Sequence, residues 1–292
     1  MKRAMIIAGS DSSAGAGVQA DIKTFSALGV YATSVLTAVT AQNTLGVQGV
    51  FELPADFVRL QIDSVMSDIG ADVVKTGMIA NADIVQAIAD RARQWDIHNI
   101  VVDPVMVATS GDQLLQFRAR DALIGILLPL ARVVTANLHE AHVLTGLDIN
   151  TVRGMRQAAI AIHNMGPRNV VVKGGHLETA SEAIDVLFDG REFYEFALPR
   201  ITSRNTHGTG CTFASAIAAY LAKGEDVPKA VRDAKKYVSN ALRAAQEQRL
   251  GQGHGPVDHF WFLPRNRVPV QLSTSQAPQD WSVADAQSED SS

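Results

Sequence analysis

A regular alternation of short apolar runs with longer amphipathic segments is the feature that most constrains this fold. The runs that predict strands are Ala4–Ala8, Ser34–Thr40, Val47–Leu53, Asp72–Thr76, Asn99–Asp103, Arg132–Thr135 and Asn169–Lys173. Several are almost entirely apolar, as expected for strands buried on both faces of a parallel sheet. The segments that predict helices are Gly17–Leu28, Ala55–Ile69, Asp83–Trp95, Gln113–Leu127, Glu140–Thr145 and Val152–Met165. This order predicts an α/β protein with a doubly wound, mostly parallel sheet.

The pattern changes in the last third of the chain. Residues Ala183–Leu198 predict a β-hairpin, because two β-rich runs flank the turn-forming pair Asp189-Gly190. Two further helices are expected, at Thr212–Ala222 and Pro228–Gln248. The chain then ends in Ser, Gln, Asp and Ala without any period. We therefore expect one domain over residues 1–270 and a disordered tail over 271–292.

Composition excludes several classes of function. A net charge of −4 provides no basic surface for nucleic acid or anionic lipid. No apolar stretch reaches the roughly eighteen residues of a membrane span, and Ala4–Ala8 is too short for a signal-peptide core. The single cysteine excludes an internal disulfide and a Cys-rich zinc site. We expect a cytoplasmic enzyme or binding protein with neither nucleic acid nor membrane as partner.

The turn Gly208-Thr209-Gly210-Cys211 stands directly before a predicted helix. Its glycines allow a tight turn, and the unpaired N–H groups and positive dipole of the helix end favour bound phosphate. The alternative is a plain glycine turn before a buried helix. Cys211 stands where the dipole favours thiolate, which could take the proton of a substrate hydroxyl. The alternative for this residue is a small buried hydrophobe.

Polar side chains follow three of the predicted strands. Asp103 ends one strand, while Asn137 and Glu140 follow the next and stand three apart, on one face of a helical turn. Their oxygens could hold Mg²⁺ with its waters against nucleotide phosphates. Lys173, at the end of a third strand, could neutralise those phosphates. The alternatives are a loop cap for Asp103, a first-turn acid for Glu140 and a solvent-facing lysine for Lys173.

Three familiar motifs do not account for this chain. Gly15-Ala16-Gly17-Val18-Gln19-Ala20 matches the dinucleotide pattern, but it does not start at the strand end, and no acidic residue closes the next strand. A polar loop lining a substrate pocket, with Asp21 one turn into the following helix, is the better interpretation. The histidines of His139-Glu140-Ala141-His142 are too close for a zinc-protease site, and no Walker A sequence occurs.

Eight segments together form a specific set. They are Ala8-Gly9-Ser10-Asp11-Ser12-Ser13-Ala14-Gly15-Ala16-Gly17, Gln19-Ala20-Asp21, Ala41-Gln42-Asn43-Thr44, Lys75-Thr76-Gly77-Met78, Val102-Asp103-Pro104-Val105-Met106-Val107-Ala108, Val171-Val172-Lys173-Gly174-Gly175-His176, Asn205-Thr206-His207-Gly208-Thr209-Gly210-Cys211 and Gly253-His254-Gly255-Pro256-Val257. From Ala4 to about Trp261 the chain resembles the hydroxymethylpyrimidine and phosphomethylpyrimidine kinases of thiamine biosynthesis, in the ribokinase superfamily. Most ribokinase relatives carry Asp in place of Cys211, so the cysteine indicates the pyrimidine and pyridoxal kinase branch.

The resemblance implies a ribokinase-like three-layer α/β/α sandwich, with ATP phosphorylating 4-amino-5-hydroxymethyl-2-methylpyrimidine and then its monophosphate. It also implies a homodimer. By position, Gln42 would read the aminopyrimidine edge with its amide. The resemblance also implies that the substrate pocket is lined by Asp21, Gly9, Met78 and Val105. It implies Mg²⁺ binding by Asp103 and Glu140, and ATP binding by Asn137, Lys173, Thr206 and Thr209. Finally, it implies an anion hole at Gly208, Thr209 and Gly210, with Cys211 as the base.

One departure and two alternatives accompany the resemblance. Ala136 and His139 replace two prolines of the family pattern, although Asn137 and Glu140 keep their spacing. A pyridoxal kinase shares the fold and the cysteine, and Gln42 favours an aminopyrimidine over it. A pyrimidine-binding protein without catalysis is a further alternative. The presence of Asp103, Glu140 and the complete glycine turn argues against it.

Overall fold

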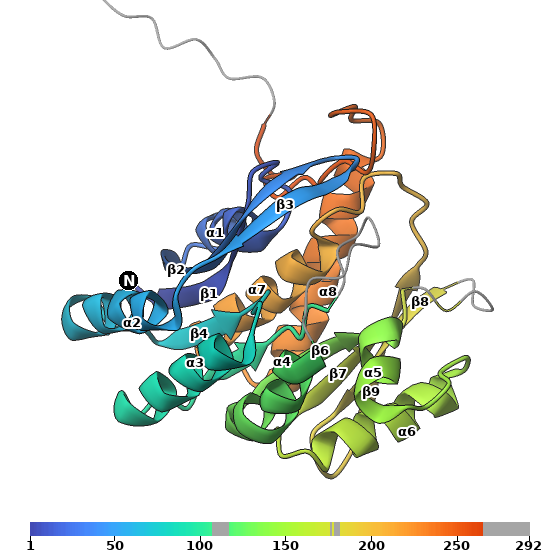
Figure 1. The fold of residues 1–292 in the computed structure, drawn as a ribbon. Coiled ribbons are helices and arrows are strands. Elements are labelled where there is room, and N and C mark those ends of the chain that lie inside the picture. Colours follow the sequence, from blue (N-terminus) through green and yellow to red (C-terminus); the bar gives the residue numbers. More distant parts are fainter. Residues whose placement is uncertain (107–116, 176, 178–181, 265–292) are drawn as a thin grey trace, which may run out of the picture. The chain divides into compact units, whose positions relative to one another are not determined.

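Strands that are far apart in sequence join one sheet in the computed structural model, which describes residues 1–106, 117–175, 177 and 182–264. Within these residues the sheet has nine strands in the order β3-β2-β1-β4-β5-β6-β7-β8-β9 (Figure 1). The strands are β1 (Arg3–Asp11), β2 (Tyr31–Asn43), β3 (Gly46–Glu52), β4 (Val73–Thr76), β5 (Ile100–Val102), β6 (Val133–Asn137), β7 (Val170–Lys173), β8 (Glu182–Phe188) and β9 (Phe193–Pro199). The run from β2 to β7 is parallel, whereas β3, β8 and β9 pair antiparallel at the edges. The predicted strands, the hairpin and the mostly parallel sheet are confirmed.

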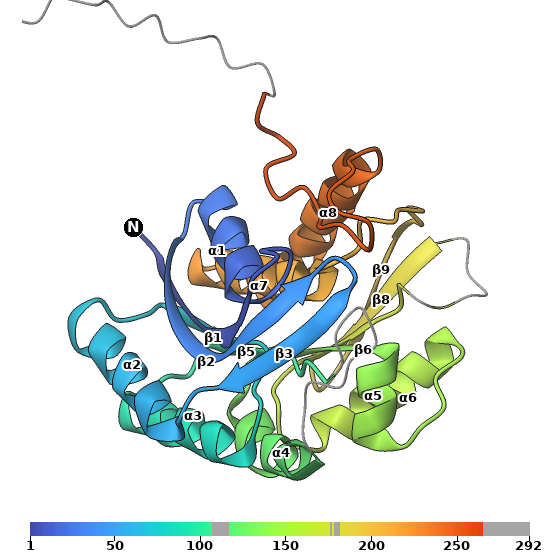
Figure 2. The same cartoon turned by 45° about the horizontal axis from the view of Figure 1, so that its top comes forward.

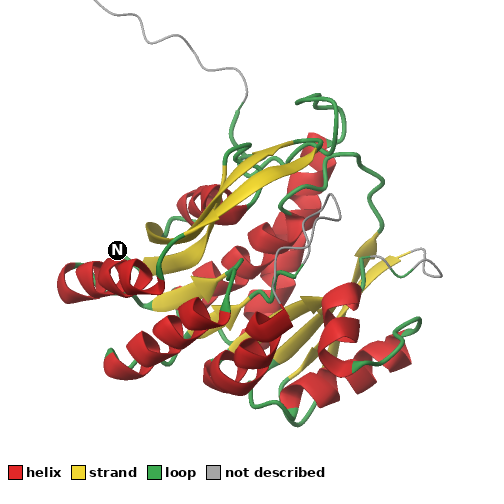
Figure 3. Ribbon diagram, viewed as in Figure 1, coloured by secondary structure: helices red, strands yellow, loops and turns green. Residues whose placement is uncertain are grey.

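Helices cover both faces of this sheet (Figure 3). They are α1 (Gly17–Ala27), α2 (Ala55–Asp68), α3 (Ala82–Gln94), α4 (Phe117–Ala122), α5 (Leu138–Thr145), α6 (Val152–His163), α7 (Thr209–Ala222) and α8 (Val227–Ala245). One face packs against α1, α7 and α8, and the other against the remaining helices, as Figure 2 shows. The three-layer α/β/α sandwich is therefore confirmed.

The first strand shows why the core forms on both sides. Met5 and Ile7 point to the core beneath α2 and α3, while Ala4, Ile6 and Ala8 point to the core beneath α1 and α7. All are buried, because alternate side chains of a strand face opposite sides of its sheet. A nearly continuous apolar strand is therefore satisfied only in the middle of such a sandwich.

Apart from Gln113–Leu127, the predicted helix boundaries differ from the structure by up to three residues. Helix α7 begins at Thr209 rather than Thr212, so the predicted turn is itself the first turn of the helix. Gly208 precedes it in the left-handed conformation, with φ of 77°, and its carbonyl accepts a bond of 2.9 Å from the N–H of Thr212. In the predicted helix Gln113–Leu127, the described part is α4 followed by a π-helical turn, and residues 113–116 lie outside the described residues.

Residues Met1–Trp261 form one compact unit, and a second unit begins at Phe262. A single domain over 1–270 stays a prediction. Outside the described residues lie the tail 271–292, the motif residues Val107 and Ala108, and His176. Within the described part, no helix has the length and apolar character that crossing a membrane requires.

The parallel direction of the central strands decides where polar groups collect. The carboxyl ends of β1, β4, β5, β6 and β7 all lie at one edge of the sheet. The amino end of α7 meets this edge, since a carbon at Cβ of Gly210 would come within 3.4 Å of Nζ of Lys173, at the end of β7. Strand ends and a helix end thus converge.

We predict that Thr151→Ala lowers the free energy of unfolding by about 1 kcal/mol, through loss of the cap on α6. The hydroxyl of Thr151 accepts a bond of 3.0 Å from the N–H of Gly154. Urea unfolding would measure the change, and Thr151→Ser, which keeps the hydroxyl, is the matched control. Equal stability of the Ala and Ser variants would show that the cap contributes nothing.

Candidate active site

A cavity of about 520 Å³ opens at the carboxyl edge of the sheet. It runs from the ends of β1 and β2, past the first turn of α7, to the ends of β6 and β7. The predicted site residues that line it are Gly9, Gln42, Met78, Val105, Asp103, Asn137, Glu140, Lys173, Thr206, Gly208, Thr209, Gly210 and Cys211. The structure therefore brings together residues that span most of the chain.

Asp21 is the exception, and the prediction that it lines the pocket was wrong. Its side chain is completely buried, and its carboxylate accepts bonds of 2.9 and 3.0 Å from Nζ of Lys75 and one of 2.7 Å from Ser215. Burial works to lower the pKa of Lys75, but Asp21, and more weakly Cys211 and Asp103, raise it above its ordinary value. Lys75 therefore stays an ammonium ion behind the cavity wall. A lysine inside an otherwise apolar strand was the sequence signal for this pair.

The turn that opens α7 is held by a very close approach of two loops. A side chain at Gly208 would overlap the carbonyl oxygen of Gly15, and the left-handed φ also favours glycine there. The turn is tightened further by Thr209, whose hydroxyl donates to the carbonyl of Thr206 at 2.7 Å. The first N–H groups of the helix thus face the cavity, where a helix start attracts anions.

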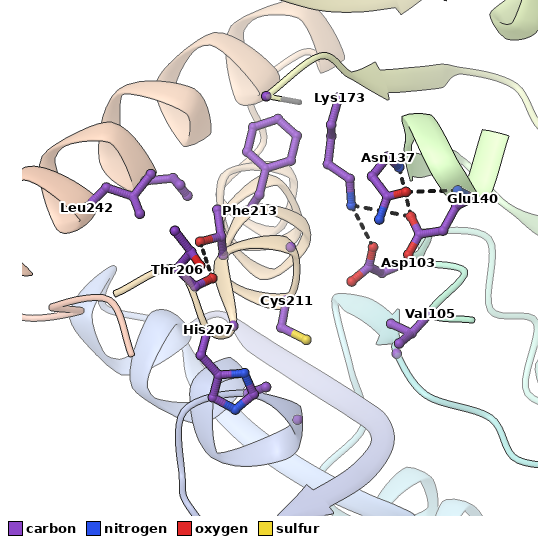
Figure 4. Close-up of a pocket in the computed structure, with 18 of the residues that line it drawn as sticks. Asp103, Val105, Asn137, Glu140, Lys173, Thr206, His207, Cys211, Phe213 and Leu242 are labelled. Atoms are coloured by element: carbon purple, nitrogen blue, oxygen red, sulfur yellow. Dashed lines mark hydrogen bonds and ion pairs between the residues drawn. The ribbon is translucent and has the colours of Figure 1, made fainter. Parts of the chain in front are cut away.

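Cys211 projects its sulfur into the cavity from this first turn (Figure 4). Burial raises the pKa of the thiol to about 12, and the charges of Asp21 and Asp103 act in the same direction. Lys75 and a backbone bond with Gly17 only partly oppose them. The expected preference for thiolate at this helix end is therefore not met, because desolvation and, more weakly, the two nearby carboxylates raise the pKa of the thiol.

At the other end of the cavity, an ammonium group sits between two carboxylates (Figure 4). Nζ of Lys173 lies 3.0 Å from Asp103 and 3.8 Å from Glu140. Asp103 also accepts a bond of 3.1 Å from the hydroxyl of Thr135. The carboxylates work to raise the pKa of Lys173 against the effect of burial, and the net shift is upward. This end of the cavity therefore holds a fixed cation together with oxygen ligands.

Glu140 is positioned by a capping box at the start of α5. The side chain of Asn137 accepts a bond of 2.8 Å from the N–H of Glu140, and Glu140 accepts one of 2.7 Å from the N–H of Asn137. Burial, together with Asp103, raises the pKa of Glu140 to about 7, although Lys173 opposes the shift. Loss of the two family prolines has thus left the geometry of this turn intact.

Gln42 lies at the opposite end, on β2. Its Oε1 accepts a bond of 3.1 Å from the hydroxyl of Thr40, and its Nε2 lies 3.4 Å from Nε2 of His207. Gly9 and Met78 are in contact beside it, since a carbon at Cβ of Gly9 would come within 3.1 Å of the Met78 sulfur. The amide of Gln42 therefore lines the cavity beside His207.

Several lining residues were missed by sequence reasoning. An apolar slot next to Lys173 is lined by Phe213, Val238, Leu242 and Ile201. Lys235 and Asp185, which line the same cavity, form a buried ion pair of 2.7 Å. Phe213, Val238 and Leu242 lie on helices α7 and α8, where an apolar residue equally predicts core packing, so the sequence carried no separate signal. Asp11 and His207, a pair at 2.8 Å, were likewise missed as a unit, although both lie within quoted motifs.

The sequence is similar to proteins of known class. A family model described as phosphomethylpyrimidine kinase matches residues 11–258. A hydroxymethylpyrimidine/phosphomethylpyrimidine kinase of Rhizobium meliloti is 52% identical over 258 residues, covering 88% of this chain and 96% of that protein. A thiamine biosynthesis bifunctional protein of Geobacter sulfurreducens is 52% identical over 256 residues, covering 88% of this chain but 52% of that protein. The chain thus spans about half the length of the bifunctional relatives that it matches.

A solved structure supports the same relationship. Pyridoxal kinase from Staphylococcus aureus in complex with ADP aligns with a TM-score of 0.83 and 38% identity, over 92% of this chain and 96% of that chain. The likeness confirms the predicted ribokinase-like fold.

The raised pKa of Glu140 predicts a pH-dependent stability. Because the folded state keeps the proton up to about pH 7, the folded state binds more protons than the unfolded state between pH 4.5 and 7. Stability contributed by this residue therefore falls as the pH rises through that window. We expect Glu140→Gln, which preserves the capping box, to raise the melting temperature by several degrees at pH 8 and to change it little at pH 5.

Scanning fluorimetry without nucleotide or divalent metal would measure both temperatures. Glu182→Gln is the control, because Glu182 is an exposed carboxylate. A Glu140→Gln protein that melts at or below the wild-type temperature at pH 8 would contradict the assignment.

Proposed function

Because the chain belongs to the phosphomethylpyrimidine kinase family, we propose that it transfers the γ-phosphoryl group of ATP to 4-amino-5-hydroxymethyl-2-methylpyrimidine and then to its monophosphate. The observation that carries the proposal is one cavity with Gln42 at one end, Lys173 between carboxylates at the other, and the first turn of α7 between them. A donor and an acceptor substrate can thus meet at fixed N–H groups.

We assign the Gln42 end to the pyrimidine. A primary amide offers a donor and an acceptor side by side, which matches a ring nitrogen beside an exocyclic amine. Met78 and Val105 would pack on the ring, and Gly9 leaves room for its edge. A ring seated there would direct its hydroxymethyl group toward Cys211 and the first turn of α7.

We assign the slot at Phe213, Val238 and Leu242 to the adenine ring, because it is apolar and borders Lys173. Asn137, Lys173, Thr206 and Thr209 would then lie along the phosphates. The transferring group carries charge on its equatorial oxygens in a loose transition state, and catalysis then consists mainly of positioning and electrostatic stabilisation. The N–H groups of Gly210 and Cys211, together with Lys173, would supply that stabilisation.

Asp103 and Glu140 suit a divalent ion that arrives with nucleotide. Among the residues that the structure describes, no three His, Cys, Asp or Glu side chains converge as a metal site. Two carboxylates that leave most positions to water and phosphate oxygens are what Mg²⁺ takes beside a nucleotide. Bound there, Mg²⁺ would neutralise charge on the phosphates. Deprotonation of Glu140 is needed for that role, and nearby positive charge favours it.

We propose that Cys211 accepts the proton of the attacking hydroxyl. The raised pKa of its thiol means that little thiolate exists near neutral pH. The turnover number should therefore rise with pH wherever thiolate limits the rate. Lys75, behind the wall, is the cation that opposes the carboxylates and makes deprotonation less costly.

For Cys211→Ala we expect at least a hundredfold loss of kcat, in line with loss of a general base, while pyrimidine Kd changes less than about threefold. Stopped assays from pH 7 to 9.5 should also show a rate increase in the wild type that the variant lacks. Calorimetry would measure the binding. Wild-type turnover in the variant would show that the thiol only packs.

The substrate itself is tested by a product-resolved assay with ATP, Mg²⁺ and the pyrimidine, its monophosphate or pyridoxal. We expect both pyrimidines to be phosphorylated, with pyridoxal slower. Pyridoxal is included because of the close structural likeness to a pyridoxal kinase. Turnover of neither pyrimidine would overturn the proposal, and pyridoxal turnover alone would favour the second activity.

Removal of the amide that we assign to the pyrimidine gives a sharper test. Gln42→Ala should raise KM for the pyrimidine at least tenfold, because a site built for two hydrogen bonds would lose both. KM for ATP should stay within about twofold, since Gln42 lies at the far end of the cavity from Lys173. An unchanged pyrimidine KM would remove Gln42 from substrate recognition.

A homodimer and a cytoplasmic location remain our proposals from the family resemblance. Gel filtration with light scattering would measure the first.

A further inference from the structure

His207 stands between the two halves of the proposed site. Its side chain is 8% exposed and lines the cavity, and its ring points toward the blue N-terminal segments, away from Lys173 and Glu140 (Figure 4). Nε2 lies 2.8 Å from Oδ2 of Asp11 and 3.4 Å from the amide nitrogen of Gln42. The residue that follows it is Gly208, the cap of α7.

Asp11 holds the ring in one orientation. Its Oδ1 accepts bonds from the N–H and hydroxyl of Ser13, at 2.8 and 2.7 Å, and its Oδ2 accepts bonds from the N–H groups of Gly15 and Ala16. Burial works to raise the pKa of Asp11, but the bond with His207 and the loop bonds together hold it well below its usual range. An ionised carboxylate only accepts, so Nε2 of His207 carries the proton that points to Asp11, and the Gln42 amide nitrogen at 3.4 Å is a packing neighbour of the ring rather than a hydrogen-bond partner.

The same histidine is locked to the phosphate-side turn through its backbone and its ring. A side chain at Gly15 would overlap Cδ2 of His207, and one at Gly208 would overlap the carbonyl of Gly15. The loop of Asp11 and the turn at Gly208 therefore interlock without space between them. A shift of the imidazole would displace the cap of α7, because only one peptide bond separates the two residues.

A C-terminal strap, Gly253–Val257, ties both halves together from outside. The N–H of His207 donates to the carbonyl of Gly255 at 3.0 Å. In the same strap, the N–H groups of Gly253 and His254 donate to the hydroxyl and the carbonyl of Thr44, at 3.1 and 2.9 Å. Thr44 stands two residues beyond Gln42. The strap thus fixes the backbone of His207 and the backbone of Thr44, near Gln42, so that the imidazole is held between these two segments.

We propose that His207, held by Asp11, is a positioning residue that couples the orientation of the Gln42 amide to the geometry of the first turn of α7. The coupling would align the acceptor hydroxyl with the N–H groups of that turn once the pyrimidine edge is bound. This inference rests on the proposed function, and it assigns to the Asn205–Cys211 segment a role in substrate recognition besides phosphate binding. His207 acts through Gln42 and Gly208 and needs no contact with the reacting atoms.

The test compares His207→Leu, which removes the bond to Asp11, with His207→Gln, which keeps a donor. For His207→Leu we expect kcat to fall about tenfold to a hundredfold, as for a small misplacement of reacting groups, and pyrimidine KM to rise severalfold. KM for ATP should stay within about twofold. His207→Gln should recover most of the activity. His98→Gln is the control, because His98 is exposed and pairs only with a surface carboxylate in the structure described.

Combination with Gln42→Ala separates positioning from a merely structural role. If His207 acts through Gln42, the two losses in kcat/KM for the pyrimidine are not additive. Strict additivity, or wild-type kcat and pyrimidine KM in a folded His207→Leu protein, would overturn the inference. Urea unfolding measures whether each variant folds. If His207→Leu fails to fold, Asp11→Asn takes its place in the double-mutant cycle with Gln42→Ala, because Asp11→Asn leaves the imidazole in place. An inactive wild type would instead reject the proposed function.

Discussion

Burial of the central strands on both faces is the constraint on which the rest of this structure depends. A strand such as β1 sends alternate side chains into two separate cores, so a polar side chain along its length needs a buried partner, as Lys75 of β4 has in Asp21. Polar side chains collect where the parallel strands end. Asp103, Asn137 and Lys173 each stand at or just beyond such an end, and the shared strand direction makes them neighbours. The cavity follows from the topology, and its chemistry follows from which residues occupy those ends.

The ionisable groups around this cavity are balanced by one another. Lys173 lies between Asp103 and Glu140, and Lys75 is paired with Asp21 behind the wall. In this balance, burial raises the pKa of Glu140 to about 7 and that of the Cys211 thiol to about 12. Both pKa values respond to nearby charge, so a charged ligand bound beside Lys173 would act on Cys211 through space as well as through contacts. The phosphoryl transfer that we propose would then depend mainly on the positioning of the substrates and on electrostatic stabilisation, and the protein would form no covalent bond to them.

Close approach of two backbone segments explains why glycine stands at positions 15 and 208. Gly208 lies against the carbonyl of Gly15, and Gly15 against the ring of His207, so the loop after β1 and the turn before α7 are one packed unit. The segment after α8 completes this unit by bonding to Thr44 and to His207. Residues from both ends of the compact unit thus support a site whose principal groups lie between them in sequence.

The sequence by itself determined the order and type of the elements and the mostly parallel sheet, and all of its predicted site residues except Asp21 line the cavity, because apolar periodicity, glycine turns and a specific set of motifs are local properties. Only the tertiary structure decided the start of α7, the burial of Asp21 against Lys75, and the protonation of Cys211. It also decided the contacts of His207 with Asp11 and Gln42. Each of these depends on groups brought together from distant segments, and desolvation and Coulomb energy vary with distances that no local pattern encodes. A helix dipole favours thiolate, but burial of the thiol and, more weakly, two nearby carboxylates raise its pKa, and this environment exists only in the folded chain.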